Sequence, residues 1–304
     1  MGENILGAAI GLTGLISKHA RVEKVATGSI WAEGPVWLQE LGVLRWSDIP
    51  GNQIFEFNLE TRTTSVYKTE VEFTNGRTLD LDGSVIQCSH GHRRIERDRG
   101  GQIEPLVDNW NGKKFNSPND VIVASDGAIW FTDPPYGIIF EREGHPGNRE
   151  YLDHYVFRFD QKTGEVKAVI LDIEEPNGLA FSLDEKTLYV ADSSALTNEP
   201  GFGNQHVRAY DVVGSNCKNS RVFAVMQNGV PDGMRVDTHG NLWVATFDGV
   251  HVYSPKGEDL GWVPIPEKTA NVCFGGPDGN LLFVCASTSI YMIETMTSSA
   301  PRPQ

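Results

Sequence analysis

Residues 228–245 read NGVPDGMRVDTHGNLWVA, and the same pattern returns along the rest of the chain. An Asp-Gly pair at 232–233 opens a short apolar run, and a His-Gly pair at 239–240 provides a turn. A second apolar run, which contains Trp243, follows the turn. Two short apolar runs on either side of a glycine turn are typical of a β-hairpin. We therefore predict two antiparallel strands here, the first of which begins near Asp232.

The repeat behind this pattern consists of six copies. An acidic or amide residue stands seven positions before each Asp-Gly-type turn, with one extra residue in the first copy, and the copies follow one another at intervals of 39 to 58 residues. Repeats of this length made of short strands are typical of a β-propeller with about four strands per blade. The sequence thus predicts an all-β fold, a six-bladed β-propeller, rather than an irregular β-sandwich. The six positions are Glu33, Asn75, Asn119, Asn177, Asp232 and Asn271.

The two ends of the chain bear on how the propeller closes. The last repeat supplies three strand candidates, and residues 22–26 form a further candidate ahead of the first repeat. We expect this N-terminal strand to complete the last blade, because a closed ring leaves no exposed strand edge. Residues 21–304 then form a single propeller domain, and residues 1–20 form an N-terminal arm or helix packed on its body.

Charge and composition limit the partners of this protein. The formal net charge is −14, whereas binding to nucleic acid or to an anionic membrane needs a basic face. The apolar run at residues 5–16 is too short to span a bilayer. Four cysteines without C-x-x-C spacing favour reduced thiols and a cytoplasmic location. The location would be periplasmic or secreted if residues 1–20 act as a signal. The sequence does not predict the oligomeric state.

The six repeat positions predict a ring of oxygen-bearing side chains at one mouth of the central channel. In a propeller the first strand of each blade lines this channel, and each of the six residues starts such a strand. Carboxylate and amide oxygens suit hard cations such as Ca²⁺, whereas zinc prefers thiolate or imidazole. Asn and Asp also start strands and turns for backbone reasons, which is the alternative for any single position. Six residues in register favour one divalent cation, with calcium ahead of Mg²⁺, Mn²⁺ and Zn²⁺.

Three features outside the ring add candidate residues for the functional site. His90 and His92 form a His-x-His pair whose rings would share one face of a strand, but no third His or Cys is in register, so we expect His90 to be a polar channel residue. Asp120 is either a second base or a residue that bonds to the backbone at a strand start. A polar insertion at residues 138–153 follows Tyr136 and could shape a substrate pocket over the channel mouth.

Four short motifs carry a resemblance to a known family. They are Ala32-Glu33-Gly34-Pro35, Ser117-Pro118-Asn119-Asp120, Pro176-Asn177-Gly178-Leu179 and Pro231-Asp232-Gly233-Met234. With these motifs and the repeat, the chain resembles the gluconolactonase and senescence-marker-protein family of six-bladed propellers, which also includes a diisopropyl fluorophosphatase. The resemblance implies a catalytic divalent ion bound by Glu33, Asn119, Asn177 and Asp232. Some members place a basic, substrate-contacting residue where this chain has Ser117, so a sugar-acid substrate of the mammalian type is in doubt.

The function that these observations predict is metal-dependent hydrolysis of a lactone. The ion would polarise the ester carbonyl and help to activate water. Asp232 is the first candidate for the general base, followed by Asp120 and His90, and the chain has no G-x-S-x-G motif for a serine nucleophile. The substrate-binding candidates are Asn75, Ser117 and Tyr136. The alternatives are a phosphotriesterase or fluorophosphatase at the same metal, a non-catalytic calcium-binding propeller, and a strictosidine-synthase-like propeller, which would not need the four ligand positions.

Overall fold

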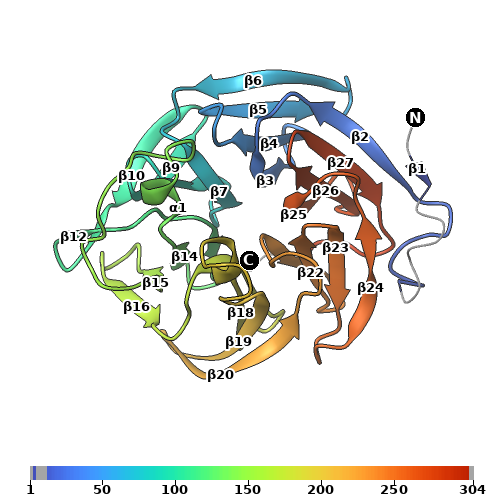
Figure 1. The fold of residues 1–304 in the computed structure, drawn as a ribbon. Helices are drawn as coiled ribbons and strands as arrows, with labels where there is room; N and C mark the ends of the chain where they lie inside the picture. The colour runs from blue at the N-terminus through green and yellow to red at the C-terminus, as the bar shows by residue number, and fades with distance from the viewer. Residues whose placement is uncertain (1–2, 5–11, 301–304) are drawn as a thin grey trace.

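The computed structural model describes residues 3–4 and 12–300 and shows six β-sheets arranged around a central axis (Figure 1). The described residues contain one short α-helix, α1 (Tyr136–Ile139), and one short 3-10 helix, η1 (Ser194–Leu196). None of the helices in this part of the chain is long and apolar enough to cross a membrane. The prediction of an all-β, six-bladed propeller is confirmed.

The first three blades are four-stranded antiparallel sheets whose strands follow the chain from the axis outward. Blade 1 contains β3 (Ala32–Leu38), β4 (Val43–Asp48), β5 (Gln53–Asn58) and β6 (Thr63–Thr69). Blade 2 contains β7 (Thr74–Leu79), β8 (Val85–Ser89), β9 (Arg94–Arg99) and β10 (Gln102–Val107). A small hairpin of β11 (Asn109–Trp110) and β12 (Lys113–Lys114) leads to blade 3, which contains β13 (Val121–Val123), β14 (Ile129–Asp133), β15 (Tyr155–Phe159) and β16 (Val166–Ile170).

The last three blades repeat this order, and the final one closes the ring. Blade 4 contains β17 (Pro176–Phe181), β18 (Thr187–Asp192), β19 (His206–Val213) and β20 (Asn216–Val225). Blade 5 contains β21 (Met234–Val236), β22 (Leu242–Thr246), β23 (Gly249–Tyr253) and β24 (Asp259–Pro264). Blade 6 contains β25 (Thr269–Gly275), β26 (Leu281–Ala286) and β27 (Ser289–Glu294) from the C-terminal part, and β2 (Arg21–Thr27) and β1 (Glu3–Asn4) from the N-terminal part.

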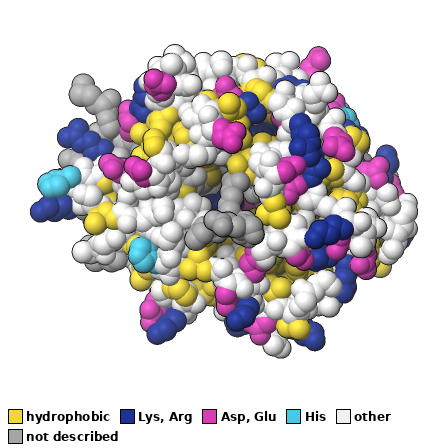
Figure 2. All heavy atoms as spheres, turned by 180° about the vertical axis from the view of Figure 1, so that it is seen from behind, with side chains coloured by type: hydrophobic (Ala, Val, Ile, Leu, Met, Phe, Trp, Pro, Cys, Tyr) yellow, Lys and Arg dark blue, Asp and Glu magenta, His cyan; other side chains and the backbone are white. Residues whose placement is uncertain are grey.

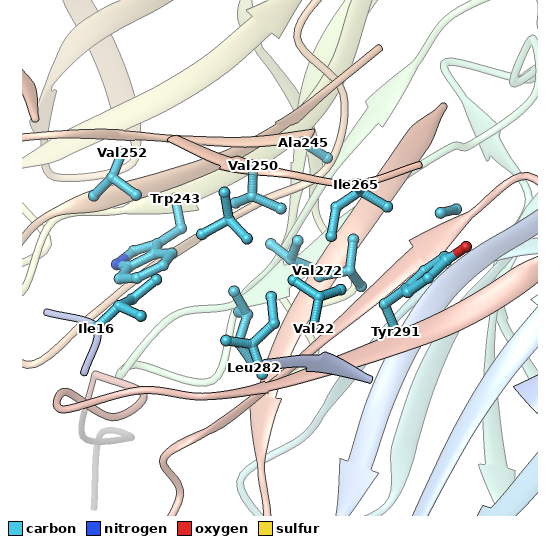
Figure 3. Close-up of a cluster of buried hydrophobic side chains, with 14 of the residues drawn as sticks. Ile16, Val22, Trp243, Ala245, Val250, Val252, Ile265, Val272, Leu282 and Tyr291 are labelled. Atoms are coloured by element: carbon cyan, nitrogen blue, oxygen red, sulfur yellow. The ribbon is translucent and has the colours of Figure 1, made fainter. Parts of the chain in front are cut away.

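The closure of blade 6 is the predicted one. Strand β2 lies antiparallel to β27, with Glu23 opposite Met292 and Lys24 opposite Tyr291, and the predicted strand at residues 22–26 lies within β2. Residues 5–11 of the predicted N-terminal arm lie outside the described residues. Its later part packs on the body, since Leu12 and Ile16 are buried in a cluster between blades 5 and 6 (Figure 3).

Glycines allow the inner strands to approach one another at the axis. A Cβ on Gly34 would lie 2.0 Å from the carbonyl oxygen of Asn75, and a Cβ on Gly178 would lie 2.1 Å from the carbonyl oxygen of Asp232. In each case the glycine of one blade meets the ring residue of the next. Irregularities in the pairing with the second strand follow Glu33 and surround Asn177. The glycines of the motifs thus set the spacing of the ring.

The C-terminal segment lies at the opposite mouth of the channel. Its backbone binds the turns at the far ends of the inner strands, with Thr238 N donating to Ser298 O at 3.0 Å and Ala300 N donating to Val236 O at 3.0 Å. Figure 2 shows that acidic and basic side chains alternate over the face seen from behind. The ring residues, which start the inner strands, therefore belong to the mouth that the C-terminal segment does not cross.

Candidate functional site

The ring predicted from the repeat is present at the starts of the six innermost strands. Five of its members are buried, and Asp232 is partly exposed. Asn119 and Asp232 precede β13 and β21 by two residues each, and the others lie within their strands. The backbone also joins neighbouring ring positions, because Gly76 N donates to Asn119 O at 2.8 Å. The inner strands therefore bring oxygen-bearing side chains from all six blades to one mouth of the channel.

Glu33 and Asp232 form a pair of carboxylates in this ring. Glu33 Oε2 accepts hydrogen bonds from Gly34 N at 2.7 Å and from Asn271 Nδ2 at 3.0 Å. The Asn177 side chain interacts with Asp232 and opposes the rise in the pKa of that carboxyl group. Burial raises the pKa of Glu33 to about 7, and burial together with the charge of Glu33 raises the pKa of Asp232 well above its ordinary value. Both shifts mean that the ionised pair lacks compensating positive charge.

Asp120 is a third carboxylate in electrostatic contact with this pair. Its Oδ1 accepts a hydrogen bond from Val121 N at 2.9 Å, and its buried Oδ2 has no hydrogen-bond partner among the described residues. Burial raises the pKa of Asp120, and the guanidinium of Arg235, with Nη1 at 3.9 Å from Oδ2, opposes this shift. The strand-start bond predicted as its structural role is present, and its free oxygen leaves a second role open.

The donor set fits a hard divalent cation. No three His, Cys, Asp or Glu side chains in residues 3–4 and 12–300 form a cluster that could hold a metal. A site in the ring would therefore use the two carboxylates of Glu33 and Asp232 and the amide oxygens of Asn119 and Asn177. Two carboxylates balance a divalent charge, and oxygen donors suit Ca²⁺ or Mg²⁺ better than zinc.

His90 and Asn75 form a buried polar pair beside the ring. His90 Nδ1 lies 2.9 Å from Glu143 O, which can only accept, so Nδ1 carries the proton and Nε2 accepts from Asn75 Nδ2 at 3.3 Å. Burial lowers the pKa of His90 to about 4. His90 is neutral at physiological pH, and its one lone pair is already in use. This arrangement favours a role in positioning Asn75 over a role as general base.

The His-x-His pair does not lie on a strand, and the expectation that both rings share one face is wrong. Strand β8 ends at Ser89 and β9 begins at Arg94, so both histidines lie in the turn between them. His90 points into the site, whereas His92 Nδ1 contacts Glu96 Oε1 at 2.8 Å and its side chain is 41% exposed. The two rings diverge because a turn does not keep the two-residue alternation of a strand.

Ser117 and Tyr136 are linked by one loop. Ser117 is fully buried, and its Oγ donates to Pro134 O at 2.6 Å and accepts from Gly137 N at 2.9 Å. The only hydroxyl proton of Ser117 is therefore used within the protein. Tyr136, at the start of α1, lies within electrostatic reach of Asp232. A substrate contact by Ser117 stays a prediction, and the structure gives this residue a role in holding the loop that carries Tyr136.

The insertion at residues 138–153 contributes a carboxylate that the sequence did not single out. Glu143 lies within electrostatic reach of both Glu33 and Asp232 and raises their pKa values. The insertion is fixed by His90, which donates to Glu143 O, and by His145 Nε2, which lies 2.8 Å from Glu72 Oε2. Glu143 lies outside the repeat, so no periodic signal could have found it.

Known proteins share this fold and this ring region. Residues 31–288 match the family model described as SMP-30/Gluconolactonase/LRE-like region. The chain is 29% identical to a gluconolactonase of Zymomonas mobilis over 97% of this chain and 89% of that protein. It is 33% identical to a regucalcin of Danio rerio over 90% of this chain and 87% of that protein. The solved structure of a gluconolactonase from Xanthomonas campestris matches with a TM-score of 0.86 and 35% identity, over 93% of this chain and 92% of that one. Since the family model spans most of its length, the chain belongs to the SMP-30/gluconolactonase/LRE-like family.

Proposed function

We propose that this protein is a divalent-metal-dependent lactonase that opens a sugar-type lactone by hydrolysis. The observation that carries the proposal is the desolvated pair of Glu33 and Asp232 within a ring of amide oxygens. Relatives named as gluconolactonases, and a pentonolactonase of Haloferax volcanii that is 29% identical over 86% of this chain, support the lactone as substrate class.

The residues of the ring divide into ligands and a base. Glu33, Asn119, Asn177 and Asp232 would hold the cation, most favourably Ca²⁺. When bound, the cation would polarise the lactone carbonyl and stabilise the negative charge that develops on its oxygen. Asp232 is the partly exposed carboxylate of the pair, so it can reach a water molecule at the channel mouth and accept its proton. Asn177, which interacts with Asp232, would help to orient that carboxylate.

Two further groups would support the same step. Asp120 has a buried oxygen without a hydrogen bond, 3.9 Å from Arg235 Nη1, and is the second candidate for the base. The insertion carries Glu143, which lies within electrostatic reach of Glu33 and Asp232, so its charge would favour a bound cation and disfavour an anionic ligand. The product of lactone hydrolysis is a carboxylate, so Glu143 and the acidic pair would also favour its release. The insertion at residues 138–153 would then set substrate choice rather than the chemical step.

A pH-stat assay tests this function directly. The purified protein is stripped with a chelator and then assayed on a panel of five- and six-membered lactones, with and without added Ca²⁺, Mg²⁺, Mn²⁺ or Zn²⁺. We expect acid release from lactones only with a divalent ion, and none for Glu33→Gln. A phosphotriester in the same panel separates lactonase from phosphotriesterase activity. Full activity after stripping, or calcium binding with no hydrolysis of any substrate, would contradict the proposal.

A further inference from the structure

Three buried aspartates occupy the same place in blades 1, 3 and 4. Each is the last residue of the second strand of its blade, and each is at most 1% exposed. Each carboxylate accepts hydrogen bonds from two consecutive backbone N–H groups in the segment that leads into the inner strand of the same blade. The three residues are Asp48 in β4, Asp133 in β14 and Asp192 in β18.

These N–H groups lie at the same two positions in every case, three and two residues before a proposed cation ligand. In blades 3 and 4 a proline, which has no N–H, stands between them and the ligand. The bonds are those from Ile30 N and Trp31 N to Asp48 Oδ1 at 2.9 and 3.0 Å ahead of Glu33, from Asn116 N to Asp133 Oδ2 at 2.7 Å and Ser117 N to Asp133 Oδ1 at 2.9 Å ahead of Asn119, and from Glu174 N to Asp192 Oδ2 and Glu175 N to Asp192 Oδ1 at 3.2 Å each ahead of Asn177. The aspartates therefore hold the backbone that carries three of the four proposed ligands.

The two blades without a proposed ligand have a serine hydroxyl at this place. In blade 2 Ser89 Oγ donates to Glu72 O at 3.1 Å, and in blade 6 Ser287 Oγ donates to Lys268 O at 3.2 Å. Each of these carbonyl oxygens belongs to the residue three positions before the ring asparagine of its blade. A requirement of the fold alone would apply to all six blades, so it does not explain why the carboxylates accompany proposed ligands.

Blade 5 bears a proposed ligand and holds the approach to it in another way. Its second strand ends at Thr246, whose Oγ1 donates to Asp248 Oδ1 at 2.7 Å. Asp248 Oδ2 accepts from Asn228 Nδ2 at 2.8 Å, four residues before Asp232, so a carboxylate acts here through a side chain instead of the backbone. Asp232 is the partly exposed base candidate, whereas the three ligands held through the backbone are buried.

Buried carboxylates are well suited to fixing a ligand. Hydrogen bonds to an ionised acceptor are shorter than neutral ones and roughly twice as strong. A site whose ligands are already in place does not have to order them when the ion binds. Each carboxylate is itself held by a further side chain, namely Gln53 Nε2 at 3.3 Å from Asp48 Oδ2, Tyr151 Oη on Asp133 Oδ2, and Asn204 Nδ2 at 3.0 Å from Asp192 Oδ2.

We propose that these three aspartates are positioning residues of the cation site, which fix the backbone ahead of a ligand and thereby tighten calcium binding. This inference rests on the proposed metal-dependent function and adds residues that lie outside the ring. It also joins the insertion at residues 138–153 to the site, because Tyr151 of the insertion donates to Asp133, and Asp133 holds the segment before Asn119.

The test uses asparagine variants, which each remove one charge but differ in the bonds that they keep. Both donors of blade 1 bind the same oxygen of Asp48, and the carbonyl oxygen of an asparagine can accept both. Asp133 and Asp192 use separate oxygens for their two donors, so an asparagine there loses one bond and turns its amide group toward an N–H. A difference among the three variants therefore reports on the bonds and not on the charge.

Asp237→Asn is the matched control. Asp237 is fully buried and accepts from Asn241 N at 2.9 Å and from Trp243 Nε1 at 3.0 Å, but it lies in the turn at the opposite mouth of the channel. Calorimetric titration measures calcium affinity, and thermal unfolding measures stability. The luminescence lifetime of bound Eu³⁺ in light and heavy water reports how much water the ion keeps. The titrations are run at about pH 8, because burial raises the pKa of Asp133 to about 7.

We expect calcium affinity to fall about 10–100-fold in Asp133→Asn and Asp192→Asn, and less than about threefold in Asp48→Asn. Bound Eu³⁺ should keep an additional water molecule in the first two variants, and their rate on a lactone should recover when calcium is raised. Asp237→Asn should unfold at a lower temperature with a calcium affinity within about twofold of the parent. Asp192→Asn carries the comparison if Asp133→Asn does not fold.

Two results would overturn the positioning role while leaving the cation site in place. One is an equal loss of affinity in Asp48→Asn, Asp133→Asn and Asp192→Asn, which would assign the effect to charge. The other is parental affinity in both Asp133→Asn and Asp192→Asn. A parent protein that binds no calcium would instead overturn the proposed function, and the positioning role with it.

Discussion

Asn75 and Asn177 occupy equivalent positions in the repeat, yet their side chains have different partners. Asn177 interacts with Asp232, within the proposed ligand set, whereas Asn75 Nδ2 contacts His90 Nε2 at 3.3 Å. Equivalent backbone placement thus gives equivalent access to the channel but not an equivalent role. The chemistry of each position is set by the side chains that the neighbouring blades and the insertion bring to it, and this difference can be tested at single residues.

Asp232→Asn should lower kcat on a lactone far more than Asn75→Ala. The asparagine cannot accept a proton, and the change removes one of two carboxylates that would balance the cation. Loss of a general base typically costs about 10²–10⁴-fold. Asn75→Ala removes only the bond to His90, so we expect a loss of less than about tenfold. The assay is initial-rate hydrolysis in a pH-stat at saturating calcium. Similar small losses in both variants would place the reacting centre elsewhere in the channel.

The pKa of Glu33, raised to about 7 from an ordinary value of 4.5, predicts how pH affects metal binding. Protons compete with the cation below about pH 7, so apparent calcium affinity should fall about tenfold per pH unit for each proton displaced. In the metal-free protein, rising pH has the opposite effect: it lowers the contribution of Glu33 to folding stability. The folded state binds this proton more tightly than the unfolded state, so the contribution of Glu33 to stability is fully present below about pH 4.5 and is lost as pH rises through about 7.

Calorimetric titration and thermal unfolding at pH 5.5, 7 and 8 check both statements. The rise in unfolding midpoint on adding calcium should be small at pH 5.5 and largest at pH 8, because binding to the folded state alone adds stability. Titrations in two buffers of different ionisation enthalpy should show proton release at pH 6. A calcium affinity that does not change between pH 5.5 and 8 would contradict the assignment of Glu33 as a ligand.

The inner strands are the elements that make the site, and they were also the most predictable part of the molecule. Their starts follow from a periodic sequence signal, so Glu33, Asn119 and Asp232 could be placed before any coordinates were known. The insertion carries no period. The position of Glu143 depends on tertiary contacts such as the bond from His90 to its carbonyl oxygen, and the sequence offered no signal for that contact. The turn that contains both His90 and His92 was missed for a similar reason, because a short apolar run does not mark where a strand ends.

Gly178→Ala should destabilise the fold and weaken calcium binding together. The new methyl group would lie 2.1 Å from the carbonyl oxygen of Asp232, so the inner strands of blades 4 and 5 would have to separate. Overpacking of this kind costs about 1–3 kcal/mol, and more where the backbone must move. Gly147→Ala is the matched control, because its Cβ would meet nothing nearer than 3.7 Å. Urea unfolding and calcium titration measure the two effects, and a Gly178→Ala protein that matches the control would disprove the close approach.

His145→Ala should raise KM without a comparable change in calcium affinity. His145 Nε2 contacts Glu72 Oε2 at 2.8 Å and the ring lies edge-on to Phe73, so this residue fastens the insertion to blade 2. His92→Ala is the control, since His92 also lies on blade 2, to which His145 binds, but contacts Glu96 rather than the insertion. We expect a severalfold change in relative rates across a lactone panel for His145→Ala alone. An identical substrate profile in both variants would show that the insertion is only a connector.

At the scale of the whole molecule, the ring of blades depends on a strand that is distant in sequence from its neighbours. Strand β2 completes blade 6 by pairing with β27, which joins the two ends of the chain. The shortfall of strands in the last repeat allowed this closure to be predicted. The packing of Leu12 and Ile16 against blades 5 and 6 could not be predicted residue by residue, because an isolated apolar run does not identify its partner surface. Ring closure holds all six inner strands in register, so the proposed metal site would depend on it.

Two N-terminal truncations distinguish the packing of Leu12 and Ile16 on the body from the closure of blade 6 by β2. Removal of residues 1–20 keeps β2 but removes Leu12, which is fully buried, and Ile16, which is 6% exposed. Deleting a buried leucine side chain costs about 2–5 kcal/mol, so this variant should fold with a lower urea midpoint.

Removal of residues 1–27 also deletes β2 and exposes the edge of β27, and exposed edges pair with other chains. We expect loss of cooperative unfolding, larger species on size-exclusion chromatography and no calcium binding. A peptide spanning residues 12–27 should restore calcium binding in part, because it can supply the missing strand. A stable monomer with parental calcium affinity after removal of residues 1–27 would show that blade 6 holds the ring without its N-terminal strand.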